Sequence, residues 1–471
     1  MKREELLETD KYHAEHLEEW MFLRAAHAGY RELIKLGLLD DFRDSAQYEN
    51  VGRGLGFSYS AQIVELTTGF ISQSQFVEDF SAVADHPPWA MFESDCDLLG
   101  TDFDAWWNEA RVIAAVYGFV GVLTTQPGGG NPADMSASGA YPYISMYAPH
   151  NILSRKWERD PVTGRPILAH LKLRQYDPDS VLIWTREDFE TWDISGDKPF
   201  RIEEASGPNA LGEIPFTLFF RIRNPGTAWD GVSLIQHVAP IDANIVRSAI
   251  RADKIEHMAA FPMFVRPRPD AFDRNKGVHV IGPEEVTEFD PETPSAKPYW
   301  LAPEADRALA PILESWKLKK QEIYEMAFLQ SLVMAGGSKA ARSADSQRQL
   351  FRFLEARLAS MVTYECEARR SVVRNWLKWQ NMEDRFAEIT IEHSMRFDVE
   401  GFIAAVEDML TEDSLLGRYS PTARKEIRKR LAERGTLRNA DPLTKQAIYD
   451  EIDDYPDTGE NIFAGIPPEK E

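Results

Sequence analysis

The chain has few cysteines and no long apolar segment. Two cysteines, Cys96 and Cys366, occur among 471 residues, and their distance in the sequence predicts no zinc knuckle, redox pair or disulfide framework. That usage fits a reducing, cytoplasmic origin. The first 20 residues contain no apolar signal-peptide core, so no signal peptide is expected. The longest apolar runs, such as FTLFF, fall far short of the roughly 20 residues that cross a bilayer, and we expect no membrane span.

Positive charge is also scarce. Lysine and arginine number 53 against 76 aspartates and glutamates, which gives a formal net charge of −23 at pH 7. Proteins that grip nucleic acid through its phosphates usually present a basic surface, so this chain is expected to repel DNA over most of its surface. The plain interpretation is solubility. A sharper one is a surface that must lie near DNA without holding it.

Catalytic motifs are missing as well. The sequence contains no G-x-x-x-x-G-K-[ST] phosphate loop and no G-x-S-x-G nucleophile elbow. The glycines of GRGLGF (52–57) lack the dinucleotide fingerprint. We therefore expect no cofactor, no bound metal and no enzymatic activity.

Two clusters of metal-binding residue types have plainer explanations. His13 and His16 share one face of an expected helix without a third ligand nearby, which favours a solvated helix face. The acidic segment 93–104 could hold Mg²⁺ for nuclease chemistry, but loop solvation and helix capping explain it better. A metal-dependent nucleic-acid enzyme stays open as an alternative. The carboxylates concerned are Glu93, Asp95, Asp97, Asp102 and Asp104.

The organisation of the chain is more informative than its motifs. Hydrophobic residues make up 43% and charged residues 27%, as in folded proteins, and the length predicts two to four domains. Apolar spacings of three and four predict helices over 3–36 and 59–80, and another after Asp102, a plausible N-cap. Residues 119–222 are β-rich with turn signals between the segments. The prediction is an α+β chain.

The second half is expected to be mainly helical. A helix over 231–261, with Ser233 or Asp242 as its cap, precedes the proline-rich residues 262–303, which contain short β-like pieces. Another helix follows, and then a pattern over 345–381 without glycine or proline, long enough to span roughly 50 Å. Its periodic positions are Leu350, Leu354, Leu358, Met361, Glu365, Ala368, Val372 and Trp376.

A glycine-rich, basic break separates the last two of these helices. The stretch AGGSKAARSADS (335–346) places Gly336 and Gly337 where the chain must reverse, because glycine gives the backbone the freedom to do so. Ser343 or Asp345 can cap the helix that follows. Lys339 and Arg342 then lie at the tip of the break.

This order of parts resembles bacteriophage portal proteins, the rings at the capsid vertex through which DNA is packaged and ejected. NALGEIPFTLFFRIRN followed by GVSLIQHVAPIDANIVRSAIRADKIEHMAAFPMFV is similar to the family's passage from the wing into the first stem helix. YISMYAPHNILSRKWERDPVTGRPI is similar to its wing strands, and LLGRYSPTARKEIRKRL to its crown helices. The resemblance covers roughly residues 60–450, and the glycine-rich loop 127–139 has no counterpart in it.

The resemblance implies a portal-like subunit with a mixed α/β wing, a helical stem, a small β-containing clip, a long kinked helix and a helical crown. It implies no enzymatic activity. The parts would be 1–225 wing, 226–261 stem helix, 262–303 clip, 304–328 second stem helix, 329–344 tunnel loop, 345–397 long wing helix and return, and 398–471 crown and acidic tail.

The implied partners belong to a phage particle. Twelve copies would form a closed ring around double-stranded DNA, at the portal vertex of the virion and in the host cytoplasm during assembly. The ring would contact the terminase large subunit, the head-completion adaptor, the scaffold and the major capsid protein, and no membrane. The expected DNA-facing residues of the tunnel loop are Gly336, Gly337, Ser338, Lys339 and Arg342. The expected partner-binding residues of the clip are Arg266, Arg268, Asp270, Glu284, Glu285 and Glu288.

Charge supports the tunnel loop as the DNA contact. Residues 339–378 hold nine basic and four acidic side chains, a local excess of +5 within a chain whose remainder carries −28. We expect Lys339 and Arg342 to face DNA from a largely acidic channel, because each phosphate contact adds affinity and tight binding would stall movement. Salt bridges between subunits are expected for Arg352 to Lys378, and they are an equal alternative to DNA contact for Lys339 and Arg342. A non-portal structural or adaptor protein is the other alternative.

Overall fold

The computed structural model is a mixed α+β protein that divides into two units, Met1–Met395 and Arg396–Glu471. The structure describes residues 2–36, 58–74, 76–126, 140–161, 163–176, 179–196, 198–225, 229–260, 263–267, 286–289, 297, 299–301, 305–327 and 344–393, with Lys425, Lys429 and 448–453 of the second unit.

The first unit begins with three helices where one was predicted over 3–36. They are α1 (Arg3–Leu6), α2 (Lys11–Ala28) and α3 (Tyr30–Lys35). The carboxylate of Asp10 accepts a hydrogen bond of 2.7 Å from the His13 N–H and so starts α2 as its N-cap. Gly29, with φ +96°, ends it. Local capping chemistry therefore breaks a continuous helical pattern.

The helix predicted over 59–80 is also shorter in the structure. Helix α5 (Tyr59–Gln73) starts at an N-cap Ser58 whose hydroxyl accepts from the Ala61 N–H at 3.0 Å. Strand β1 (Phe76–Asp79) then pairs antiparallel with β14 (Thr390–His393). A partner more than 300 residues away thus decides the conformation of 76–79, which the local pattern could not show.

The third predicted helix is confirmed. After α6 (Pro87–Ser94), helix α7 (Phe103–Tyr117) starts at Asp102, whose carboxylate accepts from the Ala105 N–H at 2.9 Å. It ends at Gly118 in the left-handed conformation, φ +97°. Gly118 also packs directly on Gly231, since a Cβ added to Gly118 would lie 2.3 Å from the Gly231 carbonyl oxygen.

Two antiparallel sheets confirm the β-rich region. One has the strand order β10-β2-β3, and the other the order β4-β5-β6-β7-β8, with β9 also paired to β7. The strands are β2 (Phe119–Thr125), β3 (Tyr143–Tyr147), β4 (Ile152–Arg159), β5 (Pro166–Tyr176), β6 (Asp179–Thr185), β7 (Asp188–Asp193), β8 (Phe200–Arg201), β9 (Gly207–Pro208) and β10 (Phe216–Phe220).

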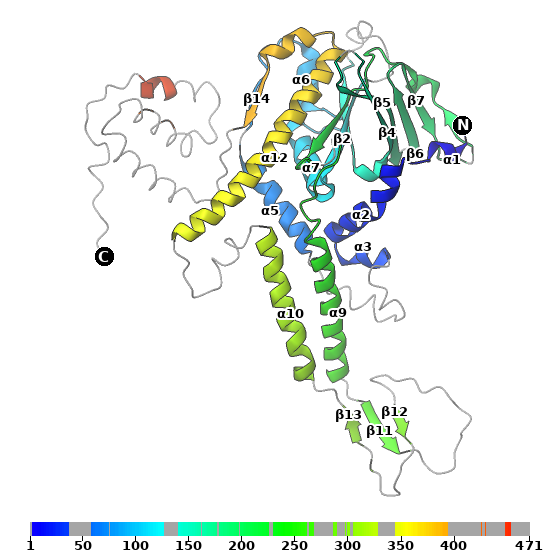
Figure 1. Ribbon diagram of the computed structural model, residues 1–471, viewed down its shortest axis with the longest axis vertical. Helices are drawn as coiled ribbons and strands as arrows, with labels where there is room; N and C mark the ends of the chain where they lie inside the picture. The colour runs from blue at the N-terminus through cyan, green and yellow to red at the C-terminus, as the bar shows by residue number, and fades with distance from the viewer. Residues whose placement is uncertain are drawn as a thin grey trace, which may run out of the picture. The chain divides into compact units, whose positions relative to one another are not determined.

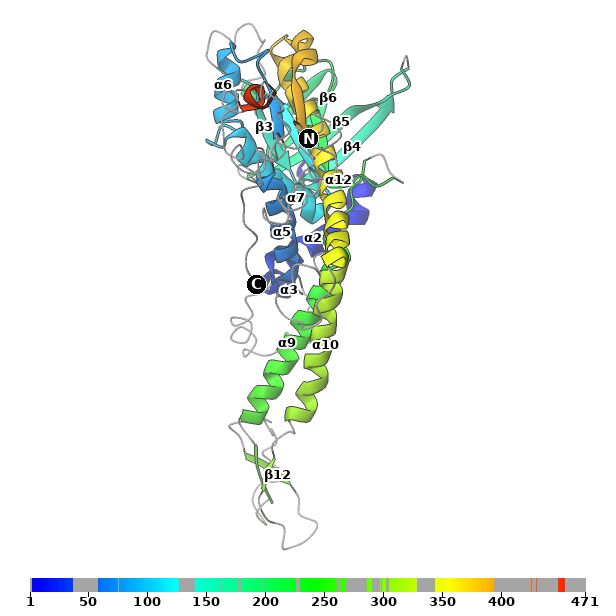
Figure 2. The ribbon, with the colours of Figure 1, turned by 90° about the vertical axis from the view of Figure 1, so that its left-hand side faces the viewer.

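The second half of the first unit contains a helical hairpin. Helices α9 (Ala239–Ala260) and α10 (Ala305–Met326) lie side by side, as Figures 1 and 2 show. Between them in the sequence, β11 (Met263–Pro267) pairs parallel with β12 (Val286–Phe289) and antiparallel with β13 (Tyr299–Leu301).

Helix α9 begins later than the predicted residue 231. The Ser233 hydroxyl, expected as a cap, donates instead to the Val116 carbonyl at 2.6 Å. The Leu234 N–H donates to the Ala115 carbonyl at 2.8 Å. The segment before α9 therefore runs along the end of α7 before the helix starts, with Pro240 tolerated in its first turn.

The longest element is α12 (Ala344–Trp379), 36 residues, which confirms the predicted long helix within two residues at each end. It packs along β10 and β2 and against α5 (Figure 1). The 3₁₀ turns of Glu383–Glu388 lead from it to β14. In the second unit, residues 448–453 are helical and Lys429 pairs with Asp453 at 2.6 Å. No helix among the described residues is long and apolar enough to cross a membrane.

Aromatic side chains dominate the core between α6, α7 and α12. The Trp89 and Trp376 rings meet edge to face with centroids 5.0 Å apart, and Trp107 packs on Phe219 in the same way at 5.4 Å. These rings are almost fully buried. Burial of such large side chains contributes about 3–5 kcal/mol each when measured by truncation to alanine, so this core fixes the last part of α12 in the body.

Candidate functional site

The predicted tunnel-loop residues lie outside the described residues. They are Gly336, Gly337, Ser338, Lys339 and Arg342. The structure gives the helices on both sides, with α10 ending at Met326 and α12 starting at Ala344. The structure thus describes the helix before and the helix after the predicted reversal of the chain. The DNA-facing role of the residues between them stays a prediction.

Two of the six predicted clip residues fall within the described residues. Arg266 of β11 and Glu288 of β12 are register partners in the parallel pair. The structure therefore brings one basic and one acidic position together on adjacent strands. The other four, Arg268, Asp270, Glu284 and Glu285, lie outside the described residues, and partner binding by this group stays a prediction.

A buried ionic network holds the middle of α12. Arg111 of α7 donates twice to the Glu365 carboxylate, at 2.7 and 2.8 Å, in a bidentate pair. Arg369 donates to the same Glu365 at 3.1 Å, to Glu78 of β1 at 2.8 Å and to Asp104 of α7 at 2.9 Å. The side chains of Arg111, Glu365 and Arg369 are 3%, 1% and 1% exposed. Two elements distant in sequence, α7 and β1, are thereby joined to α12.

The charges in this network compensate one another. Burial tends to lower the pKa of Arg369, but the carboxylates of Glu365, Glu78 and Asp104 outweigh it and raise that pKa. The guanidinium also lies over the Phe76 ring, 4.0 Å from its centroid. Every hydrogen-bonding face of this arginine is therefore satisfied, which makes the network an anchor rather than a reactive site.

Two indoles hold the last turns of α12. Trp376 Nε1–H donates to the Pro142 carbonyl and Trp379 Nε1–H to the Thr124 carbonyl, each at 3.0 Å. Both rings are buried. Since buried indole N–H groups need an acceptor, these bonds fix the rotation of the helix as well as its position.

Three of the cations along α12 for which salt bridges between subunits are expected have partners within the chain. Arg369 is consumed by the buried network, Arg374 pairs with Glu383 at 2.7 Å, and Lys378 bonds Glu213 of the same chain. The cause is the return of 383–393 and the β10 side of the body to this face of the helix, which the sequence pattern did not reveal. Much of the local +5 charge is thus neutralised within the chain.

The helical hairpin is tied to α5 near its root. The Asp242 carboxylate accepts from the Ser60 N–H at 2.8 Å and from its hydroxyl at 2.7 Å, so it caps the start of α5 rather than that of α9. Burial raises the pKa of Asp242. On the other helix, the Lys320 ammonium lies 5.7 Å from the Tyr59 ring centroid and 5.9 Å from that of Tyr324. Both helices of the hairpin therefore contact the body.

The acidic segment 93–104 is explained by its backbone partners. Asp95 accepts from the Gly100 N–H at 2.9 Å, and Asp97 from the Leu99 and Thr101 N–H groups at 2.9 and 3.3 Å. Asp102 caps α7 and Asp104 pairs with Arg369. Across the part of the chain that the structure describes, no group of three or more histidine, cysteine, aspartate or glutamate side chains could hold a metal ion.

The pair of histidines in α2 is not on a solvated face as expected. His13 is buried, and its Nε2 hydrogen-bonds the His150 carbonyl at 3.0 Å. The His16 ring stacks on Tyr12 with centroids 4.2 Å apart. His13 therefore links α2 to the 3₁₀ turn Pro149–Asn151, whereas His16 contacts Tyr12 and Trp20 of its own helix.

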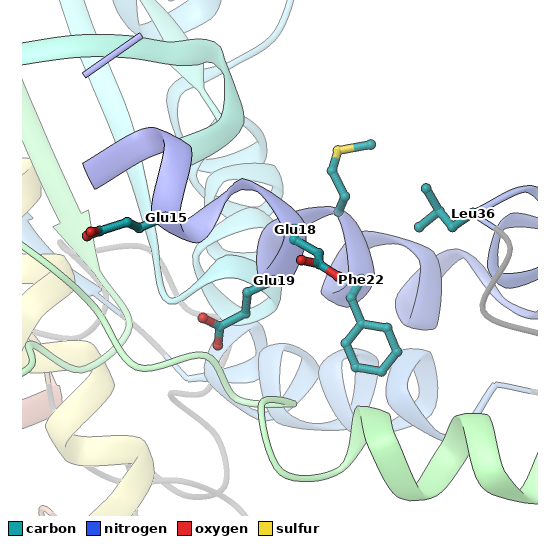
Figure 3. A pocket seen from close by; sticks show the side chains of 6 residues that line it. Glu15, Glu18, Glu19, Phe22 and Leu36 are labelled. Atoms are coloured by element: carbon teal, nitrogen blue, oxygen red, sulfur yellow. The ribbon is translucent and has the colours of Figure 1, made fainter. Parts of the chain in front are cut away.

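An open groove lies along α2 on the surface (Figure 3). Its volume is about 470 Å³, and it is lined by Glu15, Glu18, Glu19, Met21, Phe22 and Leu36. Figure 3 shows that the carboxylates and the Phe22 ring project from α2, while Leu36 follows α3. The carboxylates are not gathered around a common point, and the groove is a surface depression rather than a catalytic cleft.

The sequence did contain a sign of the buried network. Glu365 occupies a position in the apolar periodic series of the long helix, and Arg111 lies on the face of α7 that buries Trp107, Ala110 and Ala114. A charged residue at a core position needs an opposite charge. That rule predicts a partner for each, although pairing them with one another requires the fold.

Comparison with solved structures finds chains of gene transfer agent (GTA) particles. A chain from the neck of an empty GTA particle, computed with C6 symmetry, is 11% identical with a TM-score of 0.41, and the match covers 80% of this chain and 91% of that one. A chain from the virion of a native GTA particle is 10% identical, with a TM-score of 0.39, and 78% and 87% of the chains are covered.

A third chain, from the neck of a native GTA particle with C12 symmetry, is 11% identical with a TM-score of 0.39 and coverage of 85% and 94%. No protein-family model and no curated protein matches the chain.

Proposed function

We propose that this chain is the subunit of a portal ring at the capsid vertex of a phage or phage-like particle. Twelve copies would form a channel for DNA packaging and ejection, with docking sites for the terminase large subunit and the head-completion adaptor. The observation that carries the proposal is the order of elements in the second half of the chain. The helices α9 and α10 form a hairpin with a small sheet between them in the sequence, and the long, anchored α12 follows after residues 328–343.

This arrangement suits a segment that must meet DNA without being pulled away. Residues 328–343 are held on one side by α10, which contacts α5 through Lys320 and Tyr324. On the other side they continue into α12, which the Glu365 network and two indoles fix in the body. Anchored flanking helices would keep the two ends of a DNA-contacting segment in place, which is a mechanical requirement of a channel constriction.

Ion pairs within the chain along α12 reduce the number of basic residues that could contact DNA. Arg369, Arg374 and Lys378 are paired within the chain and do not add to a basic belt. Lys339 and Arg342, five and two residues before Ala344 in the sequence, then become the main candidates. Twelve copies of two cations within an otherwise acidic ring would contact phosphates briefly, and few contacts keep affinity low enough for DNA to slide.

Ring assembly is the first test. Native mass spectrometry of the purified protein, with electron micrographs, is expected to show a closed ring of about twelve copies with a central channel, because head-to-tail contacts that close produce such rings. A monomer at every salt concentration and no ring in micrographs of assembled particles would refute the proposal. A particle component without a channel would favour the alternative, a non-portal structural or adaptor protein.

The tunnel-loop assignment has its own test. Replacing Lys339 and Arg342 together by alanine is expected to leave ring assembly intact and to reduce the amount of DNA packaged in an in vivo or reconstituted packaging assay. A matched control removes two exposed cations elsewhere, Lys317 and Arg370. Loss of the ring in the double variant would show that the two residues are structural, and equal packaging by variant and control would remove their role with DNA.

The metal-dependent enzyme is the weaker alternative, because the carboxylates that suggested it are bonded to backbone N–H groups and to Arg369. Incubation of the pure protein with DNA and Mg²⁺ tests it. Cleavage that disappears in an Asp95→Asn, Asp97→Asn variant would favour the enzyme over the portal subunit.

A further inference from the structure

The open groove along α2 has an acidic part and an apolar part. Its three glutamates and Phe22 stand at positions i, i+3, i+4 and i+7 of α2, which places them on one face of the helix. Figure 3 shows Glu15 at one end and Leu36 at the other, with Phe22 between them. The groove is lined by Glu15, Glu18, Glu19, Met21, Phe22 and Leu36. A ligand that fills it therefore meets carboxylates at one end and apolar side chains at the other.

The acidic part of the groove is short of positive charge. Glu15 pairs with Lys11 at 3.6 Å. Glu18 and Glu19 are exposed, and neither forms an ion pair within the part of the chain that the structure describes. Like charges three or four positions apart repel each other on a helix, and both residues lie beyond the first turn, the part of the helix in which its dipole would favour them. A cation from another molecule would offset this repulsion.

The apolar part of the groove includes a second apolar face of α2. Trp20 and Leu23 of this helix are buried in the body, at 4% and 2% exposure. Met21 and Phe22 are half-buried, and Leu36 is 40% exposed. Because an exposed apolar surface is stabilised when another apolar surface covers it, this end of the groove favours contact with another molecule.

We propose that the groove is the docking site of a basic amphipathic segment from another protein. The segment's apolar side chains would cover Met21, Phe22 and Leu36, while its lysines or arginines would pair with Glu18 and Glu19. An amphipathic helix is recognised in this way when its apolar face enters a groove and its charges meet opposite charges at the rim. The groove volume of about 470 Å³ lies within the range of about 300–1,000 Å³ of pockets that bind ligands. DNA and acidic lipids do not fit, because their phosphates would face three carboxylates.

Charge makes a second copy of the chain the less suitable occupant. The two most exposed leucines among the described residues are Leu99, at 86%, and Leu318, at 59%. Leu99 lies in the acidic segment 93–104, and Leu318 lies one helical turn after Glu314. Either leucine would bring carboxylates toward those of the groove, and the whole chain carries a net charge of −23. The groove therefore favours a partner of opposite charge.

The test measures how a synthetic peptide binds to the purified protein. The probe is a fluorescent peptide of leucine and lysine with its leucines at helical spacing, and fluorescence anisotropy at an ionic strength of about 0.15 M gives its Kd. The double variant Glu18→Gln, Glu19→Gln is expected to raise the Kd about fivefold, because two exposed ion pairs are lost. Phe22→Ala and Leu36→Ala should each raise it about fivefold or more, because apolar contact area is lost.

Matched controls separate the groove from a general attraction between a basic peptide and an acidic protein. The double variant Glu109→Gln, Glu187→Gln removes the same charge from two exposed positions elsewhere and should bind the peptide as the wild type does. A peptide with glutamate in place of lysine should not bind, and one of the same composition with alternating leucines should bind more weakly. Leu36→Ala changes an exposed side chain and so covers the case in which Phe22→Ala does not fold.

Three results would overturn the assignment. Equal binding by the groove variants and the Glu109→Gln, Glu187→Gln control would remove the groove as the docking site, and so would no binding by the wild type. Binding to the isolated chain that disappears when the chain self-associates would identify a second copy as the occupant instead of another protein.

Discussion

Two arginines of this chain are buried to almost the same degree, at 1% exposure for Arg369 and 2% for Arg221, yet their surroundings are opposite. Arg369 has three carboxylates around it, and they raise its pKa despite burial. Arg221 has none among the described residues and a neighbouring arginine instead, and its pKa is lowered. Burial alone therefore does not show whether a charged side chain stabilises the fold. The presence of an opposite charge beside it does.

The difference follows the length of α12. Arg357 and Arg369 are 12 residues apart on this helix, or about 18 Å. At Arg369 the helix is held by ion pairs and an aromatic core, whereas Arg357 donates a hydrogen bond to the Met326 carbonyl in the last turn of α10. The Arg369 part of α12 is thus a fixed support, and the Arg357 part joins the helix to the hairpin.

The largest effect is expected from Glu365→Ala, which takes one of the three carboxylates from Arg369 and so makes its surroundings more like those of Arg221. The substitution leaves Arg111 and Arg369 buried without their shared carboxylate, and breaking such a buried pair costs about 3–5 kcal/mol. Urea unfolding followed by tryptophan fluorescence measures this loss, since Trp107 and Trp376 lie in the adjacent core.

The matched control for that substitution is Glu367→Ala, which removes an exposed carboxylate two residues away on the same helix. Surface substitutions of this kind usually change the free energy of unfolding by about 0.5 kcal/mol or less. A loss below 1 kcal/mol for Glu365→Ala, or an equal loss for both variants, would contradict the compensated network and with it the contrast between the two arginines.

The sequence predicted the parts of the fold that local chemistry determines. Asp102 and Gly118 bound α7 as their capping roles require, and the apolar spacing over 345–381 gave α12 nearly to the residue. The sequence-based prediction failed where a partner far away in the sequence determines the local conformation. Residues 76–79 continue a helical pattern but pair with 390–393 as strands, and Ser233 bonds the end of α7 instead of capping α9.

The site was predictable to a lesser degree for the same reason. Glu365 within an apolar series announces a buried charge, but only the fold brings Arg111 and Glu78 to it. Arg221 gives no sequence signal at all, because FTLFFRIRN reads as a strand followed by an ordinary basic turn. A buried charge without an opposite charge is recognised from the side chains that surround it in the fold, and the sequence alone does not show these neighbours.

A pH dependence is the next largest effect, and it probes the edge of the compensated network. Burial lowers the pKa of His393 to about 4, with Arg111 and Arg369 adding to this and Glu365 opposing it. Its Nε2 also hydrogen-bonds the Ser74 hydroxyl at 2.7 Å. The folded protein therefore keeps this ring neutral where the unfolded chain, with a pKa near 6.5, protonates it.

The sign follows from that difference. The contribution of His393 is fully present above pH 6.5 and is lost as the pH falls from 6.5 toward 4, because only the unfolded state takes up the proton. The full shift corresponds to about 3 kcal/mol, which solvent screening reduces to about 1–2 kcal/mol. Urea midpoints of wild type and His393→Gln between pH 7 and 4 measure it, and parallel curves would contradict it.

The smallest effect is expected from Arg374→Ala, on the exposed face of the same helix. Arg374 and Glu383 are 51% and 46% exposed, and such pairs contribute about 0.5 kcal/mol, which about 1 M salt removes. The more informative measurement is assembly, since Arg374 is one of the residues for which contacts between subunits were expected. If the pair is satisfied within the chain, the variant should form rings as readily as the wild type at every salt concentration. A variant that needs more protein or less salt to assemble would show that Arg374 exchanges Glu383 for a neighbouring copy, and the compensated face of α12 would then be an interface.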